Sequence, residues 1–97
     1  MKLVKLIKSK DKVHKFIAVF EKDGSIHKIR FGAVGYDDYT TFPAATRDEH
    51  RKRYLNRHKA REEWNRPDTA GSLSRWLLWE HVSMKDAIKD FKKRFNV

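Results

Sequence analysis

Two runs of alternating apolar and polar residues meet at Asp23-Gly24, within residues 13–33. Alternation with a period of two predicts β-strands, and Asp-Gly between two such runs favours a type I′ turn. This turn sets the register of the predicted hairpin, so that Phe16 lies opposite Phe31. One face of the hairpin then carries five apolar residues, which we expect to face the core: Phe16, Ala18, Phe20, Ile29 and Phe31.

The first residues of the chain, KLVKLIK at residues 2–8, also alternate and can add a third strand. An isolated hairpin is marginally stable in water, so a third strand or a docked helix is expected. The opposite face of the hairpin carries Ile17 and Val19, which the third strand would cover in part.

Residues 46–61, TRDEHRKRYLNRHKAR, are predicted to form a helix with a strongly basic surface. Thr46 and Glu49 have the spacing of a capping box, and an acidic first turn suits the positive end of the helix dipole. On a period of 3.6 residues, only a narrow stripe can face the protein: Tyr54, Leu55 and His58, which Glu62 can extend. The predicted helix therefore docks through few residues and exposes the others.

Two further helices are predicted nearer the C-terminus. The spacing of Leu73, Trp76 and Leu77 predicts a helix over residues 69–81, whose tryptophans we expect in the core. Ser83 is a candidate N-cap for an amphipathic helix that continues to Phe95.

The segment between hairpin and basic helix, residues 32–45, is rich in glycine and small polar residues and predicts an ordered loop. Asp38 and Thr40 are expected to organise it through side-chain bonds to the backbone. Together these elements predict an α+β fold, with an antiparallel β-hairpin or three-stranded sheet packed with three α-helices. We expect a single small domain, with a β-rich part over residues 1–33 and a helical part over residues 46–95.

The chain has 97 residues, with 23 Lys and Arg against 13 Asp and Glu, and a formal net charge of +10. Such an excess of positive charge indicates an anionic partner, with nucleic acid as the first candidate and an acidic protein as the second. No segment has the pattern of a membrane binder, so no membrane partner is expected. The lack of cysteine excludes disulfides and thiolate zinc sites. The N-terminal MKLVKLIKSK lacks the apolar run of a secretory signal, so we expect the protein to be intracellular when it is synthesised.

The cations of the predicted basic helix are the main candidate binding residues. A rigid element that carries several cations suits contact with phosphates, and few side chains suited to reading bases accompany them. A basic helix face without any partner is the competing interpretation. The candidates for nucleic-acid binding are Arg47, Arg51, Lys52, Arg53, Arg57, Lys59 and Arg61, supported by Lys92, Lys93 and Arg94.

Catalysis and metal binding have weaker support in the sequence. His50 and His58 are eight residues apart, whereas two histidines of a helical zinc site are four apart. Aspartates could hold Mg²⁺ for a nuclease with one of these histidines as base, but no spacing signature links Asp37, Asp38 and Asp48. We therefore expect no catalytic residue, no metal, no cofactor and no small-molecule substrate.

Four segments, taken in order, carry a family resemblance: FGAVGYDDYT, RKRYLNRH, WNRPDTAGSLSRWLLWE and KDFKKRF. Together they resemble a family of short basic proteins of unknown function from nucleocytoplasmic large DNA viruses, including algal and amoebal giant viruses. The resemblance covers roughly residues 15–95. It implies a viral protein that is packaged in the particle, on the genome or within the capsid shell.

The positive charge and the family resemblance leave three functions open. The first is non-enzymatic binding of nucleic acid, with DNA preferred over RNA, through phosphate contacts. The second is a minor capsid or cement protein that meets acidic capsid proteins during virion assembly. The third is a small nuclease-like enzyme. The first two place the protein in the virion, and in the host cell cytoplasm or nucleus during infection.

Overall fold

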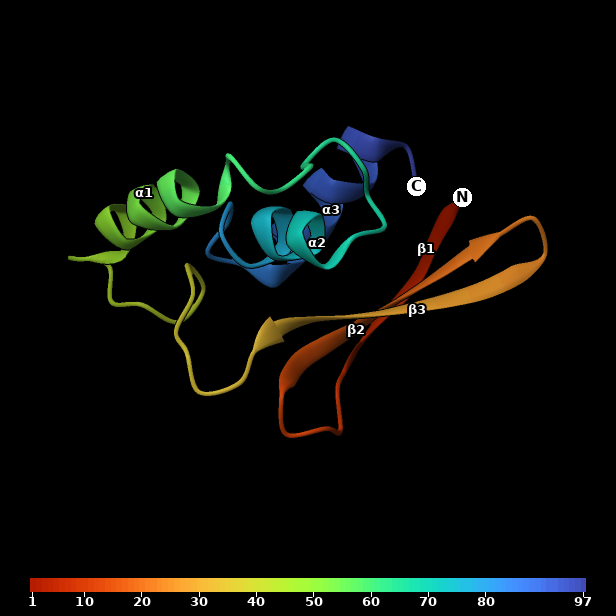
Figure 1. Ribbon diagram of the computed structural model, residues 1–97, viewed down its shortest axis with the longest axis horizontal. Helices are drawn as coiled ribbons and strands as arrows, with labels where there is room; N and C mark the ends of the chain where they lie inside the picture. Colours follow the sequence, from red (N-terminus) through yellow and green to blue (C-terminus); the bar gives the residue numbers. More distant parts are fainter.

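Three strands form one antiparallel sheet at the start of the chain. The computed structural model describes residues 1–97 and orders the strands β1-β2-β3 (Figure 1). Their bounds are β1 (Lys2–Lys8), β2 (His14–Lys22) and β3 (Ser25–Ala33). The third strand expected from the N-terminal alternation is therefore confirmed, and it occupies one edge of the sheet.

The β2–β3 hairpin has the register that its turn predicts. Phe16 pairs with Phe31, and Lys22 pairs with Ser25. Asp23 and Gly24 have φ values of 52° and 78°, both positive as a type I′ turn requires. Because side chains alternate across a strand, this register alone sends the predicted apolar residues to one face.

Strand β1 extends that apolar face. Leu3 pairs with Phe20 and Leu6 pairs with Ala18, so both leucines lie on the core side of the sheet. The register shifts between Leu3 and Lys5, which lets both leucines share one face although they are three residues apart.

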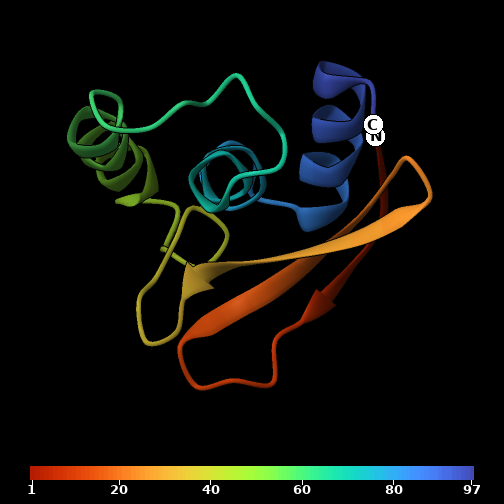
Figure 2. The same cartoon turned by 45° about the vertical axis from the view of Figure 1, so that its right-hand side comes forward.

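Three helices follow the sheet: α1 (Arg47–His58), α2 (Ala70–Leu77) and α3 (Met84–Phe95). In both ribbon views α2 and α3 lie over one face of the sheet, and α1 stands at the far side of α2 (Figures 1 and 2). The two chain ends lie close together in both views (Figures 1 and 2). The predicted α+β class, with one sheet and three helices in a small domain, is confirmed.

The core lies between the sheet and the pair α2–α3. Phe20 of the sheet and Phe91 of α3 are both fully buried, with ring centroids 6.5 Å apart. Burial of apolar side chains from both layers is the main force that holds the layers together. Residues of the chain with less than a tenth of their surface exposed include Leu3, Ala18, Phe31, Leu73, Leu77, Leu78, Trp79 and Ala87.

The last two helices begin at side-chain caps. The Thr69 hydroxyl accepts a hydrogen bond from the Ser72 amide at 3.1 Å, and the Ser83 hydroxyl accepts one from the Asp86 amide at 3.4 Å. The Ser83 cap is therefore confirmed. The predicted helix over residues 69–81 was too long, since α2 ends at Leu77 and the chain then turns so that Trp79 can pack against α1.

The capping box predicted for α1 is wrong. Thr46 makes no side-chain cap bond. The Pro43 carbonyl accepts the amides of both Thr46 and Arg47, so the Thr46 amide is not left for the Glu49 side chain. Glu49 instead pairs with Arg53 at 3.0 Å. The helix also ends three residues earlier than expected, at His58.

Candidate nucleic-acid interface and the adjoining cavity

Helix α1 is held to the protein mainly by Tyr54, its one buried residue. The Tyr54 ring stacks on the Trp79 ring, with centroids 4.3 Å apart and planes 4° apart, and on the His58 ring at 4.3 Å. Stacked aromatic pairs add to the free energy gained by burial alone. The stripe predicted from helical periodicity therefore does face the protein at Tyr54.

The Arg51 guanidinium is half-buried and forms hydrogen bonds within the protein. Its Nε donates to the Trp79 carbonyl at 2.8 Å, and its Nη2 donates to Glu80 Oε2 at 2.7 Å. Arg75 Nη1 donates to the same oxygen at 2.6 Å. Burial raises the pKa of Glu80, but the hydrogen bonds from Arg75 and Arg51 outweigh burial and hold that pKa below its usual value.

Arg47 also points inward. It is half-buried, its Nη2 donates to the Phe42 carbonyl at 3.4 Å, and its guanidinium lies 5.9 Å from the centroid of the Tyr39 ring. Its Nε is buried without a hydrogen-bond partner. Two cations at the start of α1, Arg47 and Arg51, therefore help to attach the helix and offer little charge to a partner.

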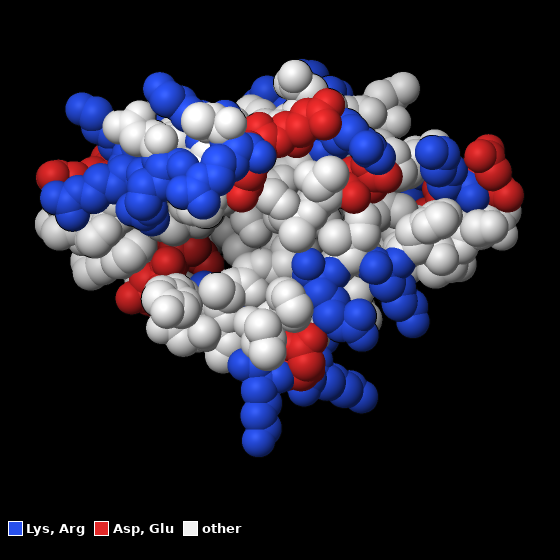
Figure 3. Space-filling model, viewed as in Figure 1, with Lys and Arg blue, Asp and Glu red and all other residues white.

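The remaining cations of the segment face outward. Arg53 makes an exposed pair with Glu49, in which both side chains are more than 60% exposed, so the pair is weak and easily exchanged. The other members have no hydrogen bond or ion pair in the protein and are exposed: Lys52, Arg57, Lys59 and Arg61. Lys and Arg side chains gather over α1 on the face of the molecule shown in Figure 3.

The second predicted cluster lies on α3, on the other side of α2 from α1 (Figures 1 and 2). Lys92 and Lys93 are exposed there. Arg94 instead lies over the Trp76 ring, 3.8 Å from its centroid, and pairs with Asp90 at 3.3 Å. The structure thus brings together the outward cations of α1 but separates them from those of α3.

Two of the three carboxylates considered for a nuclease, Asp38 and Asp48, have partners within the protein, whereas Asp37 is exposed and has none. Asp38 is buried and accepts hydrogen bonds from Lys15 Nζ at 2.7 Å and from the Thr40 amide at 2.8 Å, so the side-chain to backbone bond predicted for Asp38 is confirmed. The Thr40 hydroxyl donates to the Asp38 carboxylate and not to the backbone. Asp48 Oδ1 accepts a hydrogen bond from the Tyr39 hydroxyl at 2.6 Å. No three side chains of His, Asp or Glu converge on a point that could hold a metal ion. No observation favours the nuclease hypothesis.

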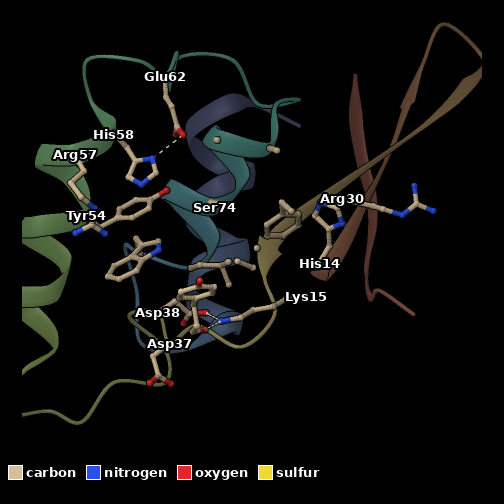
Figure 4. Close-up of a pocket in the computed structure, with 18 of the residues that line it drawn as sticks. His14, Lys15, Arg30, Asp37, Asp38, Tyr54, Arg57, His58, Glu62 and Ser74 are labelled. Carbon is tan, nitrogen blue, oxygen red and sulfur yellow. Dashed lines mark hydrogen bonds and ion pairs between the residues drawn. The ribbon is translucent and has the colours of Figure 1, made fainter. Parts of the chain in front are cut away.

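A cavity of about 550 Å³ adjoins the exposed cations of α1 (Figure 4). It is bounded by α1, by α2, by the ends of β2 and β3, and by the loop that carries Asp37 and Asp38. Figure 3 shows the surface hollowed between the basic band over α1 and the lobe below it. The volume falls within the range of about 300–1,000 Å³ that is usual for small-molecule sites.

Polar groups from distant segments converge on this cavity. His58 Nδ1 and Glu62 Oε1 are 3.0 Å apart at one end, and the Lys15–Asp38 ion pair lies at the other (Figure 4). The Tyr54 hydroxyl has no hydrogen-bond partner in the protein and points from α1 toward α2 (Figure 4). Burial, followed by the negative charge of Glu62, raises the pKa of Tyr54, so its hydroxyl stays protonated and can donate.

The sequence did not predict this cavity. Its polar residues lie as far apart in the chain as Lys15 and Ser74, and no short motif contains them. The loop signal at Asp38 and Thr40 indicated local order, but it gave no sign that Lys15 would complete the site. Only the packing of α1 against the residues after α2 creates the cavity.

The fold and site define a small basic α+β protein with an exposed cationic helix beside a partly apolar cavity. The chain belongs to DUF5754, a family of unknown function, whose match covers residues 4–58 and so runs from β1 to the end of α1. Searches among curated proteins and among solved structures find no match. None of the helices is long and apolar enough to cross a membrane.

Proposed function

We propose that this chain is a non-enzymatic nucleic-acid-binding protein that contacts phosphates, most favourably those of DNA, through the outward face of α1. The observation that carries the proposal is the group of exposed cations with no strong partner: Lys52, Arg53, Arg57, Lys59 and Arg61. Positive side chains on a rigid helix release counterions when they meet phosphates, which favours binding without reading the sequence.

The resemblance to proteins of large DNA viruses supports a viral context for this activity. In that context the protein acts on the viral genome in the host cell cytoplasm or nucleus, and it is packaged in the virion with the DNA. A formal charge of +10 on 97 residues suits a protein that neutralises part of a packaged polyanion.

The contact set differs from the one predicted from sequence. Arg47 and Arg51 attach α1 to the protein, and Arg94 packs on Trp76, so these three are not assigned to phosphate contact. Arg53 and Arg57 are one helical turn apart and project from the same side of α1. They form the centre of the proposed contact surface.

The test is fluorescence anisotropy with labelled duplex and single-stranded DNA across a salt series. The variant Lys52→Ala/Arg53→Ala/Arg57→Ala removes three proposed contacts. Its matched control, Lys12→Ala/Lys85→Ala/Lys89→Ala, removes the same charge from exposed positions outside the site. Because each lost phosphate contact reduces the slope of log affinity against log salt by roughly 0.9, the first variant should lose about three units of slope.

The control variant distinguishes affinity that comes from contacts at α1 from affinity that comes from the net charge of the protein. We expect it to keep most of the affinity and of the salt slope, since long-range attraction is screened within about 10 Å at 0.1 M salt. Equal losses in both variants would show that net charge, and not α1, governs binding. Weak binding of the unaltered protein at every salt concentration would refute the proposal.

A second candidate function is that of a minor capsid or cement protein, which the outer face of the sheet favours. That face is not covered by any helix (Figures 1 and 2). Ile7 and Ile26 are 40% and 57% exposed there, beside the cations Lys5 and Lys28. Exposed apolar side chains rimmed by cations suit an acidic protein surface.

The two candidates respond differently to one pair of changes. The variant Ile7→Ser/Ile26→Ser should leave DNA binding unchanged and should abolish incorporation into capsid shells if the protein is a cement protein. If the protein binds the genome, the α1 variant should lose DNA binding, and Ile7→Ser/Ile26→Ser should still be packaged with the DNA. Incorporation that depends on Ile7 and Ile26, without DNA binding, would establish the capsid function instead.

A further inference from the structure

The cavity beside α1 has the composition of a site for a neutral, flat, polar-edged group. Exposed apolar side chains such as Val13 and Tyr36 line it together with polar groups. Small-molecule sites are typically apolar with a few convergent polar groups that fix orientation. The cavity is therefore more than a gap in the packing.

Two carboxylates that line the cavity are already bonded within the protein. Lys15 lies 2.7 Å from Asp38, and His58 lies 3.0 Å from Glu62. A charged group placed between these two pairs would have to break one of them at a cost in desolvation. An uncharged ring can enter without disturbing either pair.

Hydrogen-bonding groups remain free for the edge of such a ring. The Tyr54 hydroxyl and the Ser74 hydroxyl both line the cavity and have no hydrogen-bond partner in the protein. With His58 Nδ1 bonded to Glu62, His58 Nε2 is also left for a ligand. These groups offer both donors and acceptors, which is what the edge of a nucleobase requires.

One uncompensated cation stands at the margin of the cavity. Arg57 is exposed, lines the cavity and has no ion pair, and it is also a member of the outward group on α1. The Asp37 carboxylate lies toward the opposite end of the cavity from Glu62 (Figure 4). A ligand with a neutral ring and one anionic group can thus place the ring inside and the anion at Arg57.

We propose that this cavity binds the base of an unpaired nucleotide, with the phosphate of that nucleotide held by Arg57 at the margin. This inference rests on the proposed function, because it adds a site for one extruded or single-stranded nucleotide to a surface that binds the phosphate backbone. Proteins that accept an unstacked base combine such a polar-edged, ring-lined pocket with cations outside it.

The first experiment isolates the cavity from the basic helix. The ¹⁵N-labelled protein is titrated with the four deoxynucleoside monophosphates, and amide and indole shifts are followed by NMR. We expect saturable shifts at residues around the cavity, including the Trp79 indole. Ser74→Phe should fill the cavity and lower the affinity at least tenfold, and Tyr54→Phe should lower it by roughly fivefold through loss of one hydrogen bond.

A second blocking variant keeps the test decisive if Ser74→Phe fails to fold. Ala33→Phe places a ring at the margin of the cavity from an exposed position at the end of β3. It should give the same loss of nucleotide binding. Unchanged nucleotide affinity in a folded blocking variant would overturn the inference, and so would the absence of saturable shifts in the unaltered protein.

The second experiment decides whether the nucleotide belongs to DNA. Anisotropy compares a duplex with one bulged nucleotide, the same duplex with an abasic bulge, and the fully paired duplex. We expect at least a fivefold preference for the bulged base over the abasic bulge, because the abasic bulge has no base that could enter the cavity. Ser74→Phe should remove this preference and leave affinity for the paired duplex unchanged.

The outcomes separate this inference from the proposed function. Salt-dependent binding of all three duplexes with no preference for the bulged base would overturn the inference and leave the proposed function standing. Saturable binding of monophosphates without any DNA binding would overturn both the proposed function and the assignment of the nucleotide to DNA, and would identify a free nucleotide as the ligand.

Discussion

The Tyr54 ring of α1 stacks on the Trp79 ring that follows α2, with 4.3 Å between centroids and 4° between planes. Since Tyr54 is the one buried residue of α1, this pair attaches the basic helix together with the inward bonds of Arg47 and Arg51. Replacing Trp79 by Ala should lower the free energy of unfolding by about 3–5 kcal/mol, as is usual when a buried large aromatic is removed. Urea denaturation followed by circular dichroism measures the change.

Tyr54→Phe is the matched control for that prediction. It keeps the stacked ring and removes only a hydroxyl that has no partner in the protein, so the expected loss is below about 1 kcal/mol. Hydrogen exchange should also show faster opening of α1 in Trp79→Ala than in Tyr54→Phe. Equal effects of the two substitutions would contradict the assignment of Trp79 as the anchor.

Arg51 and Arg53 should differ sharply in what they contribute. Arg51→Ala removes the bonds to the Trp79 carbonyl and to Glu80, and should cost about 2 kcal/mol of stability. Arg53→Ala removes an exposed pair with Glu49 and should cost no more than about 0.5 kcal/mol.

DNA affinity should rank the same two substitutions in the opposite order. Measured at a temperature where both variants are folded, Arg53→Ala should reduce the salt slope by roughly 0.9, and Arg51→Ala should leave it nearly unchanged. Similar stability losses, or a larger slope change for Arg51→Ala, would refute the separation into attaching and contacting arginines.

Stability should fall in acid partly through Glu80. The pKa of Glu80 lies below its usual value of 4.5 in the folded protein, since the hydrogen bonds from Arg75 and Arg51 outweigh burial. The stabilisation is therefore present above about pH 4.5 and is lost as pH falls through the lower pKa of the folded state. Glu80→Gln should be less stable than the unaltered protein at neutral pH, with the difference shrinking in acid.

Urea denaturation at a series of pH values measures this effect. Glu63→Gln is the control, because Glu63 is exposed and makes no ion pair. Its stability difference from the unaltered protein should be small at all pH values. A difference for Glu80→Gln that stays constant between about pH 5 and pH 3 would show that the ion pair does not titrate as described.

Two glycines with similar backbone conformation should respond differently to alanine. Gly24 and Gly32 have φ values of 78° and 79°, where any side chain is strained by roughly 1–2 kcal/mol. An added Cβ would meet nothing within 4 Å at Gly24, but at Gly32 it would lie 3.0 Å from Leu78 Cδ1 and 3.1 Å from Lys15 Cβ. Gly32→Ala should therefore cost at least about 1 kcal/mol more than Gly24→Ala.

Thermal denaturation of the two variants provides the measurement. Since both glycines have a positive φ, the crowding at Gly32 adds to a backbone strain that either substitution carries. A Gly24→Ala variant that is as destabilised as Gly32→Ala would mean that Leu78 and Lys15 yield without cost.

The hairpin shows how far local pattern can determine structure. The Asp23-Gly24 turn and the alternation on both sides of it fix the register, because a shift by one residue would turn every apolar side chain to the solvent. The cap at Ser83 was likewise predictable, since it depends on residues three positions apart.

Local pattern was not sufficient where a residue takes its hydrogen-bond or packing partner from another segment. Thr46 and Glu49 have the spacing of a capping box, yet the turn at Pro43 already satisfies the first amides, and Glu49 pairs with Arg53. The end of α2 was also missed, because Trp79 leaves the helical path to reach Tyr54, twenty-five positions earlier in the chain.

The sequence by itself determined the sheet, the number and order of the helices, and the concentration of positive charge on α1, since each depends on neighbours within a few residues. Only the tertiary structure decided which cations are free and where a cavity lies. Arg51 and Arg53 are chemically identical and two positions apart, but the direction of the helix sends one to Glu80 and the other to solvent. That choice depends on contacts 29 residues apart in the chain, which no local pattern records.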